Sequence, residues 1–150
     1  MDKIDVELLW ILQQSPSQAI PLEEMKKKNK SLSKGDNLED KLESMKKNRF
    51  VEVHKTNDSQ VRYSPTKKGN DLIWKGEAWE PIFNLITLVD PEKYTSNEIR
   101  RITNKSLVEC VTDIEYLRKE IKLIEGQSKR FKLYFVLSEK GRAYENEVDS

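Results

Sequence analysis

The chain has 150 residues, of which 36% are hydrophobic and 35% are charged, so it combines enough apolar material for a core with a very polar surface. Its 27 basic and 26 acidic residues nearly cancel, which leaves no general attraction to nucleic acid, lipid headgroups or acidic substrates. This composition excludes a membrane span and argues against a disordered tail, and any electrostatic preference must be local.

The first half of the chain predicts three helices followed by a hairpin. Apolar residues recur at helical spacing over 6–12, Pro21 opens a short second helix, and Ser33 is the candidate N-cap of a third. The period then changes to two, so residues 51–53 and 61–63 predict strands joined by a turn at 56–59. The third helix is expected to bury three residues on one face: Leu38, Leu42 and Met45.

The second half predicts the same order of elements. Apolar residues over 82–88 form its first helix, Tyr94–Ile99 opens the second, and a third starts near Ser106. A hairpin then runs from Leu123 through a turn at 125–128 to Phe131, Leu133 and Phe135. The third helix is expected to point six residues inward: Leu107, Cys110, Val111, Ile114, Leu117 and Ile121.

This parallel order reflects an internal repeat. Residues 63–69 (YSPTKKG) and 135–141 (FVLSEKG) share an aromatic-led strand end, a Thr or Ser, a basic residue and a glycine. At the same offset Leu42 corresponds to Ile114. The chain is therefore interpreted as two copies of one unit, residues 1–75 and 76–150, each near the small end for independent stability. Trp74 and Trp79 lie at the junction, where they either dock the two copies or complete the core of each.

The segments 42–51 (LESMKKNRFV) and 63–69 resemble the "LxxLxxxGLI" and "Y-x-L-T-x-K-G" signatures of winged-helix proteins, namely the MarR-like, PadR-like and archaeal winged-helix regulators. The resemblance implies an α+β fold of two tandem winged-helix units. Each would be a three-helix bundle with a hairpin wing and a following helix. The glycine of the signature is absent before either hairpin, where Asn48-Arg49 and residues 120–122 stand instead, so a different turn is expected there.

Most winged-helix proteins bind duplex DNA with the third helix in the major groove. In the first copy, the face opposite the buried stripe carries Asp36, Asp40 and Glu43, which repel phosphate. A more favourable stripe, which includes Lys34 and Lys41, flanks the core. The third helix of the second copy exposes a mixed face with Thr112, Tyr116 and Lys119. Neither helix has the basic outer face that is expected of a helix that binds strongly to DNA bases.

Positive charge gathers instead at the end of the second helix of each copy and on both hairpins. A helix-turn-helix contacts phosphates from such positions, so the pattern fits backbone anchoring without strong base readout; for the first cluster, a solvated helix end is the alternative. With the third-helix residues, the candidate nucleic-acid-binding set is Lys26, Lys27, Lys28, Lys30, Lys34, Lys41, Lys55, Arg62, Arg100, Arg101, Lys105, Thr112, Tyr116, Lys119, Lys129 and Arg130.

The sequence offers little for catalysis or metal binding. One histidine, His54, and one cysteine, Cys110, make neither a zinc cluster nor a convincing nucleophile pair, and the five glycines form no phosphate-binding loop. We expect no enzyme, metal or cofactor, and we interpret both residues as structural or incidental. A lone cysteine and the absence of a signal-peptide pattern at the start predict a reduced, cytoplasmic protein.

Two functions from different classes stay open. The first is a DNA-binding transcriptional regulator in which the two units form an internal pseudo-dimer or belong to a homodimer. The second is a protein-interaction module, similar to the tandem winged-helix subunits of the ESCRT-II membrane-sorting complex or to winged-helix subunits of transcription machinery. The acidic third helix of the first copy favours the second function.

Overall fold

A computed structural model describes residues 1–14, 17–35 and 37–149, with side chains described as far as residue 144. The chain is an α+β protein in which Asp2–Lys75 forms one compact unit and the residues from Gly76 onward form another, with Met1 grouped with the latter. We call these the first and second units and describe each by itself.

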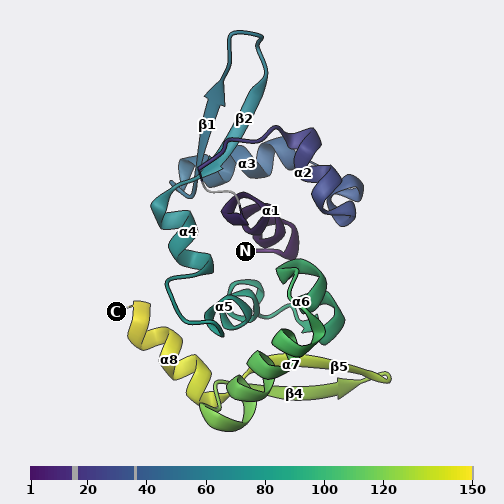
Figure 1. Ribbon diagram of the computed structural model, residues 1–150. Coiled ribbons are helices and arrows are strands. Elements are labelled where there is room, and N and C mark those ends of the chain that lie inside the picture. The colour runs from purple at the N-terminus through teal and green to yellow at the C-terminus, as the bar shows by residue number, and fades with distance from the viewer. Residues whose placement is uncertain (15–16, 36, 150) are drawn as a thin grey trace. The chain divides into compact units, whose positions relative to one another are not determined.

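The first unit is built from helices around α1 and a projecting hairpin (Figure 1). The strands pair antiparallel from Val51 with Pro65 to Lys55 with Val61, and Ile20 adds a bridge to Tyr63. This matches the predicted hairpin. Its elements are α1 (Lys3–Gln14), α2 (Leu22–Lys28), the 3-10 helix η1 (Lys30–Lys34), α3 (Leu38–Lys47), β1 (Val51–Lys55), β2 (Val61–Pro65) and α4 (Lys67–Ile73).

The core of the first unit centres on α1, which is buried along almost its whole apolar run from Val6 to Leu12. The predicted inner face of α3 is confirmed, since Leu38, Leu42 and Met45 are all buried. A carboxyl group also lies in this core. Glu7 is buried and accepts hydrogen bonds from Asn29 Nδ2 at 3.0 Å and Ser31 Oγ at 3.1 Å, which ties η1 to α1.

The second unit repeats the plan with a third strand added to its sheet. The short β3 pairs with β5, which lies between β3 and β4, and the β4–β5 hairpin extends from Ile124 paired with Leu137 to Lys129 paired with Lys132. The elements are α5 (Glu80–Val89), β3 (Tyr94–Thr95), α6 (Ser96–Thr103), α7 (Leu107–Glu115), the π-helical turn η2 (Tyr116–Glu120), β4 (Ile124–Lys129), β5 (Lys132–Leu137) and α8 (Glu139–Asp149).

The prediction that Ser33 caps the third helix is wrong. Ser33 lies inside η1, where its hydroxyl donates to the Lys30 carbonyl, and α3 starts only at Leu38 after a left-handed Asn37 with φ of 60°. The Asn29 side chain caps η1 by accepting from the Ser31 amide, so the chain makes an extra turn before α3. Lys34 therefore lies at the end of η1 and not on the third helix.

In the second unit, the N-cap at Ser106 is confirmed by a hydrogen bond from the Glu109 amide to Ser106 Oγ. The predicted inner face of this helix is only partly right. Cys110, Ile114 and Leu117 are buried, but Leu107 and Val111 are 57% and 50% exposed and Ile121 is half-buried. Asp113 takes an inner position on α7, where Lys105 pairs with it.

The expectation of a different turn before each hairpin is also wrong. Arg49 and Lys122 both adopt the left-handed conformation that favours glycine, with φ of 65° and 55°, and each lies two residues before a strand. The backbone at both positions therefore has the conformation that a glycine would adopt, although the residue is arginine in the first unit and lysine in the second.

The repeated Thr/Ser and glycine residues explain how each unit holds its hairpin to the helix that follows. Thr66 Oγ1 donates to the Arg49 carbonyl and Ser138 Oγ to the Lys122 carbonyl, both at 2.6 Å. The same hydroxyls accept from the Gly69 and Gly141 amides. A Cβ at Gly69 or Gly141 would lie 2.3 or 2.0 Å from a backbone carbonyl, so neither position has room for a side chain.

The two junction tryptophans have different surroundings. Trp79 packs within the second unit, with ring centroids 6.1 Å from Phe83, 6.5 Å from Tyr116 and 6.3 Å from Tyr144. Trp74 follows α4 and is 46% exposed. Of the two alternatives for Trp79, completion of its own unit's core is the one that these contacts support.

Candidate nucleic-acid interface

The largest predicted cluster lies at the end of α2. Lys27, Lys28 and Lys30 are exposed and form no ion pair among the side chains that the structure describes. Lys26 is half-buried and pairs with Glu23 at 3.5 Å, and Lys34 is exposed at the end of η1. These three exposed lysines, which lie close together in the sequence, are therefore available to bind a polyanion.

Lys41 has a role inside the first unit. Its Nζ lies 2.5 Å from Asp2 Oδ2 and 3.5 Å from Asp5 Oδ1, so it joins α3 to the start of α1. The hydrogen bond to Asp2 raises the pKa of Lys41. Burial acts to raise the pKa of Asp2, but hydrogen bonds from Lys41 and the Asp5 amide outweigh it and lower that pKa. We therefore do not place Lys41 in a candidate interface.

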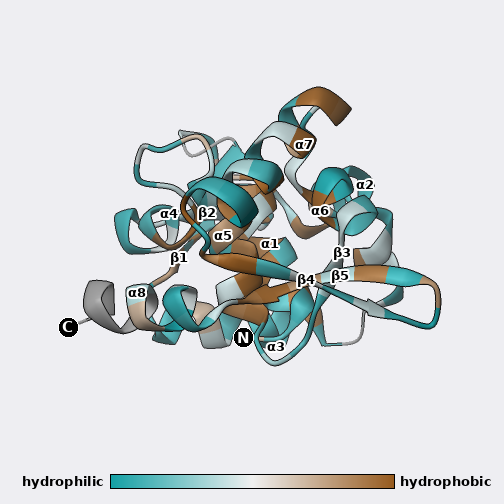
Figure 2. Cartoon of the chain, turned by 90° about the horizontal axis from the view of Figure 1, so that it is seen from below, coloured by the Kyte–Doolittle hydropathy of each residue, from teal (hydrophilic) through white to brown (hydrophobic). Residues whose placement is uncertain are grey.

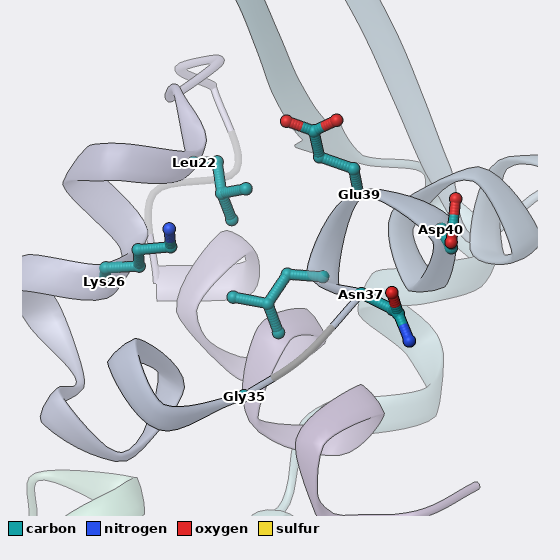
Figure 3. Close-up of a pocket in the computed structure, with 7 residues that line it drawn as sticks. Leu22, Lys26, Gly35, Asn37, Glu39 and Asp40 are labelled. Carbon is teal, nitrogen blue, oxygen red and sulfur yellow. The ribbon is translucent and has the colours of Figure 1, made fainter.

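The outward face of α3 is acidic, because Glu39, Asp40 and Glu43 are all exposed; Asp36 lies outside the described residues. A shallow pocket of about 300 Å³ lies beside it, and in Figure 3 Leu22 and Lys26 of α2 lie across from Asn37 and Glu39. Its charged groups carry opposite signs, so neither this pocket nor the helix face attracts phosphate.

The first hairpin contributes little positive charge. Lys55 is exposed, but Arg62 is half-buried and donates to the Ala19 carbonyl at 3.3 Å and to Gln60 Oε1 at 2.8 Å. The tip is closed by Asp58, which accepts from Thr56 and from the Gln60 amide. The hydrogen bond from Thr56 lowers the pKa of Asp58, so the tip carries a negative charge at neutral pH.

In the second unit, Arg100 and Arg101 are exposed on α6. Lys105 is 18% exposed at its side chain, with Nζ 2.5 Å from Asp113 Oδ2 and 3.1 Å from the Ala78 carbonyl. It holds the end of the α6–α7 turn against the start of the unit. Like Lys41, it serves the fold, and we leave it out of a candidate interface.

The third helix of the second unit, which is predicted to carry base-contacting residues, exposes apolar side chains. Leu107, Val108 and Val111 are 57%, 75% and 50% exposed, and Figure 2 shows hydrophobic colour at this end of α7. Thr112 is exposed, with its hydroxyl donating to the Val108 carbonyl. Tyr116 lies against Trp79, and Lys119 pairs with Glu115 at 2.8 Å, a hydrogen bond that lowers the pKa of Glu115.

The tip of the second hairpin combines cations with an aromatic side chain. Lys129, Arg130 and Lys132 are exposed, and Phe131 between them is 110% exposed. Arg130 and Phe131 form a two-residue turn with φ of 52° and 65°, where asparagine and glycine are preferred. Holding non-glycine residues there costs about 1–2 kcal/mol each.

The predictions that Phe131 belongs to the returning strand and that the turn lies at 125–128 are wrong, since 125–128 lie in β4, although Lys129 and Arg130 of this tip are among the predicted binding residues. No local signal marked this difference, because Phe131, Leu133 and Phe135 continue one alternating pattern, and only the pairing of Lys129 with Lys132 leaves Phe131 in the turn.

Among the described residues, no three His, Cys, Asp or Glu side chains lie close enough to hold a metal ion, and no described helix is long and apolar enough to cross a membrane. Cys110 is buried as predicted, and that burial raises the pKa of its thiol. His54 Nε2 lies 2.8 Å from Ser64 Oγ within the first hairpin.

Comparisons of the chain with family models, with curated proteins and with solved structures gave no match.

Proposed function

We propose that the chain binds duplex DNA as a tandem winged-helix regulator of transcription, and that it anchors on phosphates without strong base readout. The observation that carries the proposal is the distribution of unpaired, exposed cations. They occur at the end of α2 and at the tip of the second hairpin, positions from which a winged helix contacts the DNA backbone, while α3 and α7 lack a basic outer face.

This arrangement predicts binding with little sequence preference and a steep dependence on salt, because each neutralised phosphate releases counterions. Arg100, Arg101 and Lys55 extend the cationic surface within their units. The half-buried or paired candidates, namely Lys26, Lys41, Arg62, Lys105 and Lys119, contribute less because their charges already have partners.

The test is fluorescence anisotropy of the full chain on two unrelated duplexes over a range of salt concentrations. Changing Lys27, Lys28 and Lys30 together to Ala should weaken binding to both duplexes alike and reduce the salt slope by roughly one per lysine. Lys140→Ala, at an exposed lysine of α8, serves as the control. It should change the duplex affinity and the salt slope less than the triple variant does. Loss on only one duplex would assign these lysines to base recognition, and absence of binding to either duplex would contradict the proposal.

A protein partner is the second candidate, and two surfaces favour it: the exposed apolar residues of α7 and the acidic face of α3. Asp40→Lys separates the two functions. On the DNA proposal it removes a repulsive charge and adds an attractive one, so duplex binding should tighten. If the α3 face meets a basic protein surface, the same change should slow that association and leave duplex binding unchanged. Glu139→Lys on α8 is the matched charge reversal.

A further inference from the structure

The feature with no role in the fold is the side chain of Phe131. It is 110% exposed, it has no ring partner among the described residues, and it occupies a left-handed turn position with φ of 65°. A glycine there would form the same turn with less strain. Nothing inside the unit therefore accounts for a phenylalanine at this position.

The corresponding tip of the first hairpin shows that the scaffold does not require such a residue. There a polar turn is closed by Asp58, with the Gln60 amide donating to Asp58 Oδ1 at 3.2 Å, and Ser59 is the left-handed residue with φ of 66°. That tip satisfies its own backbone and carries an acid. The second tip presents an aromatic ring, which suggests that its partner lies outside the chain.

The charges around Phe131 indicate what that partner is. Lys129 and Lys132 are opposite each other in the strand register and Arg130 directly precedes Phe131, so three exposed cations flank one apolar residue at the tip. We propose that Phe131 enters the minor groove of duplex DNA and wedges into a base step, while Lys129 and Lys132 contact the phosphates that border the groove. This inference rests on the proposed DNA binding and specifies how the second hairpin takes part in it.

A lipid surface is less well matched to this tip. Membrane binding strengthens with the apolar area that is inserted, yet the positions just behind the tip are Gln127, Ser128 and the half-exposed Leu133, which leaves a single aromatic ring to enter the bilayer. A base step needs only one apolar wedge, and the flanking cations match its two phosphate strands. The tip therefore fits a duplex better than a bilayer.

The experiment uses the full chain and a duplex with 2-aminopurine beside a central TA step, because pyrimidine–purine steps unstack most easily. Binding of the unchanged chain should raise the 2-aminopurine fluorescence. Phe131→Gly should weaken binding roughly tenfold and abolish the rise even at saturation, since the wedge is lost. Because glycine relieves the left-handed strain, this variant should be at least as resistant to urea as the unchanged chain, so lost binding cannot be ascribed to unfolding.

Two further variants separate the wedge from the charges and from the turn. Lys129→Ala should weaken binding but keep the fluorescence rise at saturation. Ser59→Gly makes the matching change at the left-handed position of the first hairpin and should leave both affinity and fluorescence unchanged.

The outcomes distinguish failure of the wedge from failure of DNA binding. If the chain binds the duplex but Phe131→Gly binds equally well with the same fluorescence, the wedge is refuted and DNA binding stands. If the chain binds no duplex, both the wedge and the proposed DNA binding are refuted. If vesicles with anionic lipid bind the chain in a Phe131-dependent way and duplexes do not, the tip is a membrane contact and the wedge is refuted.

Discussion

The two hairpins share a base and differ at their tips. Each begins two residues after a left-handed residue, Arg49 or Lys122, and each is joined to its following helix by a hydroxyl and a glycine. The first tip is polar and closed by Asp58, whereas the second presents Phe131 among cations. The repeated residues therefore fix the attachment of each hairpin, while the fold leaves the exposed tips free to differ.

The largest expected effect tests the shared base. Gly69→Ala and Gly141→Ala each place a Cβ against a backbone carbonyl, so each should lower the free energy of unfolding of its own unit by about 3 kcal/mol or more. Urea titration of the full chain followed by circular dichroism reports both units, and thiol labelling of the buried Cys110 reports the second, which Gly141→Ala should open at lower urea and Gly69→Ala should not. Gly76→Ala, where nothing lies within 4 Å, is the control. Equal tolerance of alanine at all three sites would refute the shared role.

A smaller effect is expected at the ion pair between Lys105 and Asp113, which anchors α7 in the second unit. Lys105 and Asp113 are 18% and 12% exposed, so Lys105→Met leaves a nearly buried carboxylate unpaired and should cost about 2–3 kcal/mol. The same thiol-labelling titration measures it. Adding Asp113→Leu to that variant should recover much of the loss, because no buried charge then remains. A double variant as unstable as the single one would show that packing, and not the unpaired charge, sets the cost.

The smallest effect concerns the corresponding contact of the first unit. Lys41 is 25% exposed and Asp2 is 49% exposed, so Lys41→Met should cost only about 0.5–1 kcal/mol near neutral pH. The pKa of Asp2 is lowered, so its share of the stabilisation is present above pH 3.8 and is lost as the pH falls through the folded-state value. The pKa of Lys41 is raised, so its share is present below pH 10.5 and is lost as the pH rises through its folded-state value.

Urea titrations of the unchanged chain and of Lys41→Met across this pH range therefore form a direct check. The difference between them should be constant near neutrality and should shrink at both extremes. A difference that persists below the folded-state pKa of Asp2 would mean that the lysine acts through its aliphatic stem rather than its charge.

The sequence by itself determined the features that depend on neighbouring residues. Apolar spacing located α1, α5 and the inner face of α3, alternation located the first hairpin and the inner residues of the second returning strand, and Ser106 marked the start of α7. These predictions succeed because side-chain periodicity and N-cap hydrogen bonding depend on residues that are only a few positions apart. The repeat of Thr66 and Gly69 in Ser138 and Gly141 also pointed to two equivalent units, and the same hydrogen bonds occur in each.

Only the tertiary structure decided which charges remain available. Lys41 reaches the carboxylates of Asp2 and Asp5, and Lys105 pairs with a buried Asp113, while Leu107 and Val111 on the same helix are exposed. Local periodicity cannot predict such partners, because it does not show which charged side chains the fold brings together. The tip of the second hairpin was likewise decided by strand register, since the pairing of Lys129 with Lys132 forces Phe131 into the turn and into solvent.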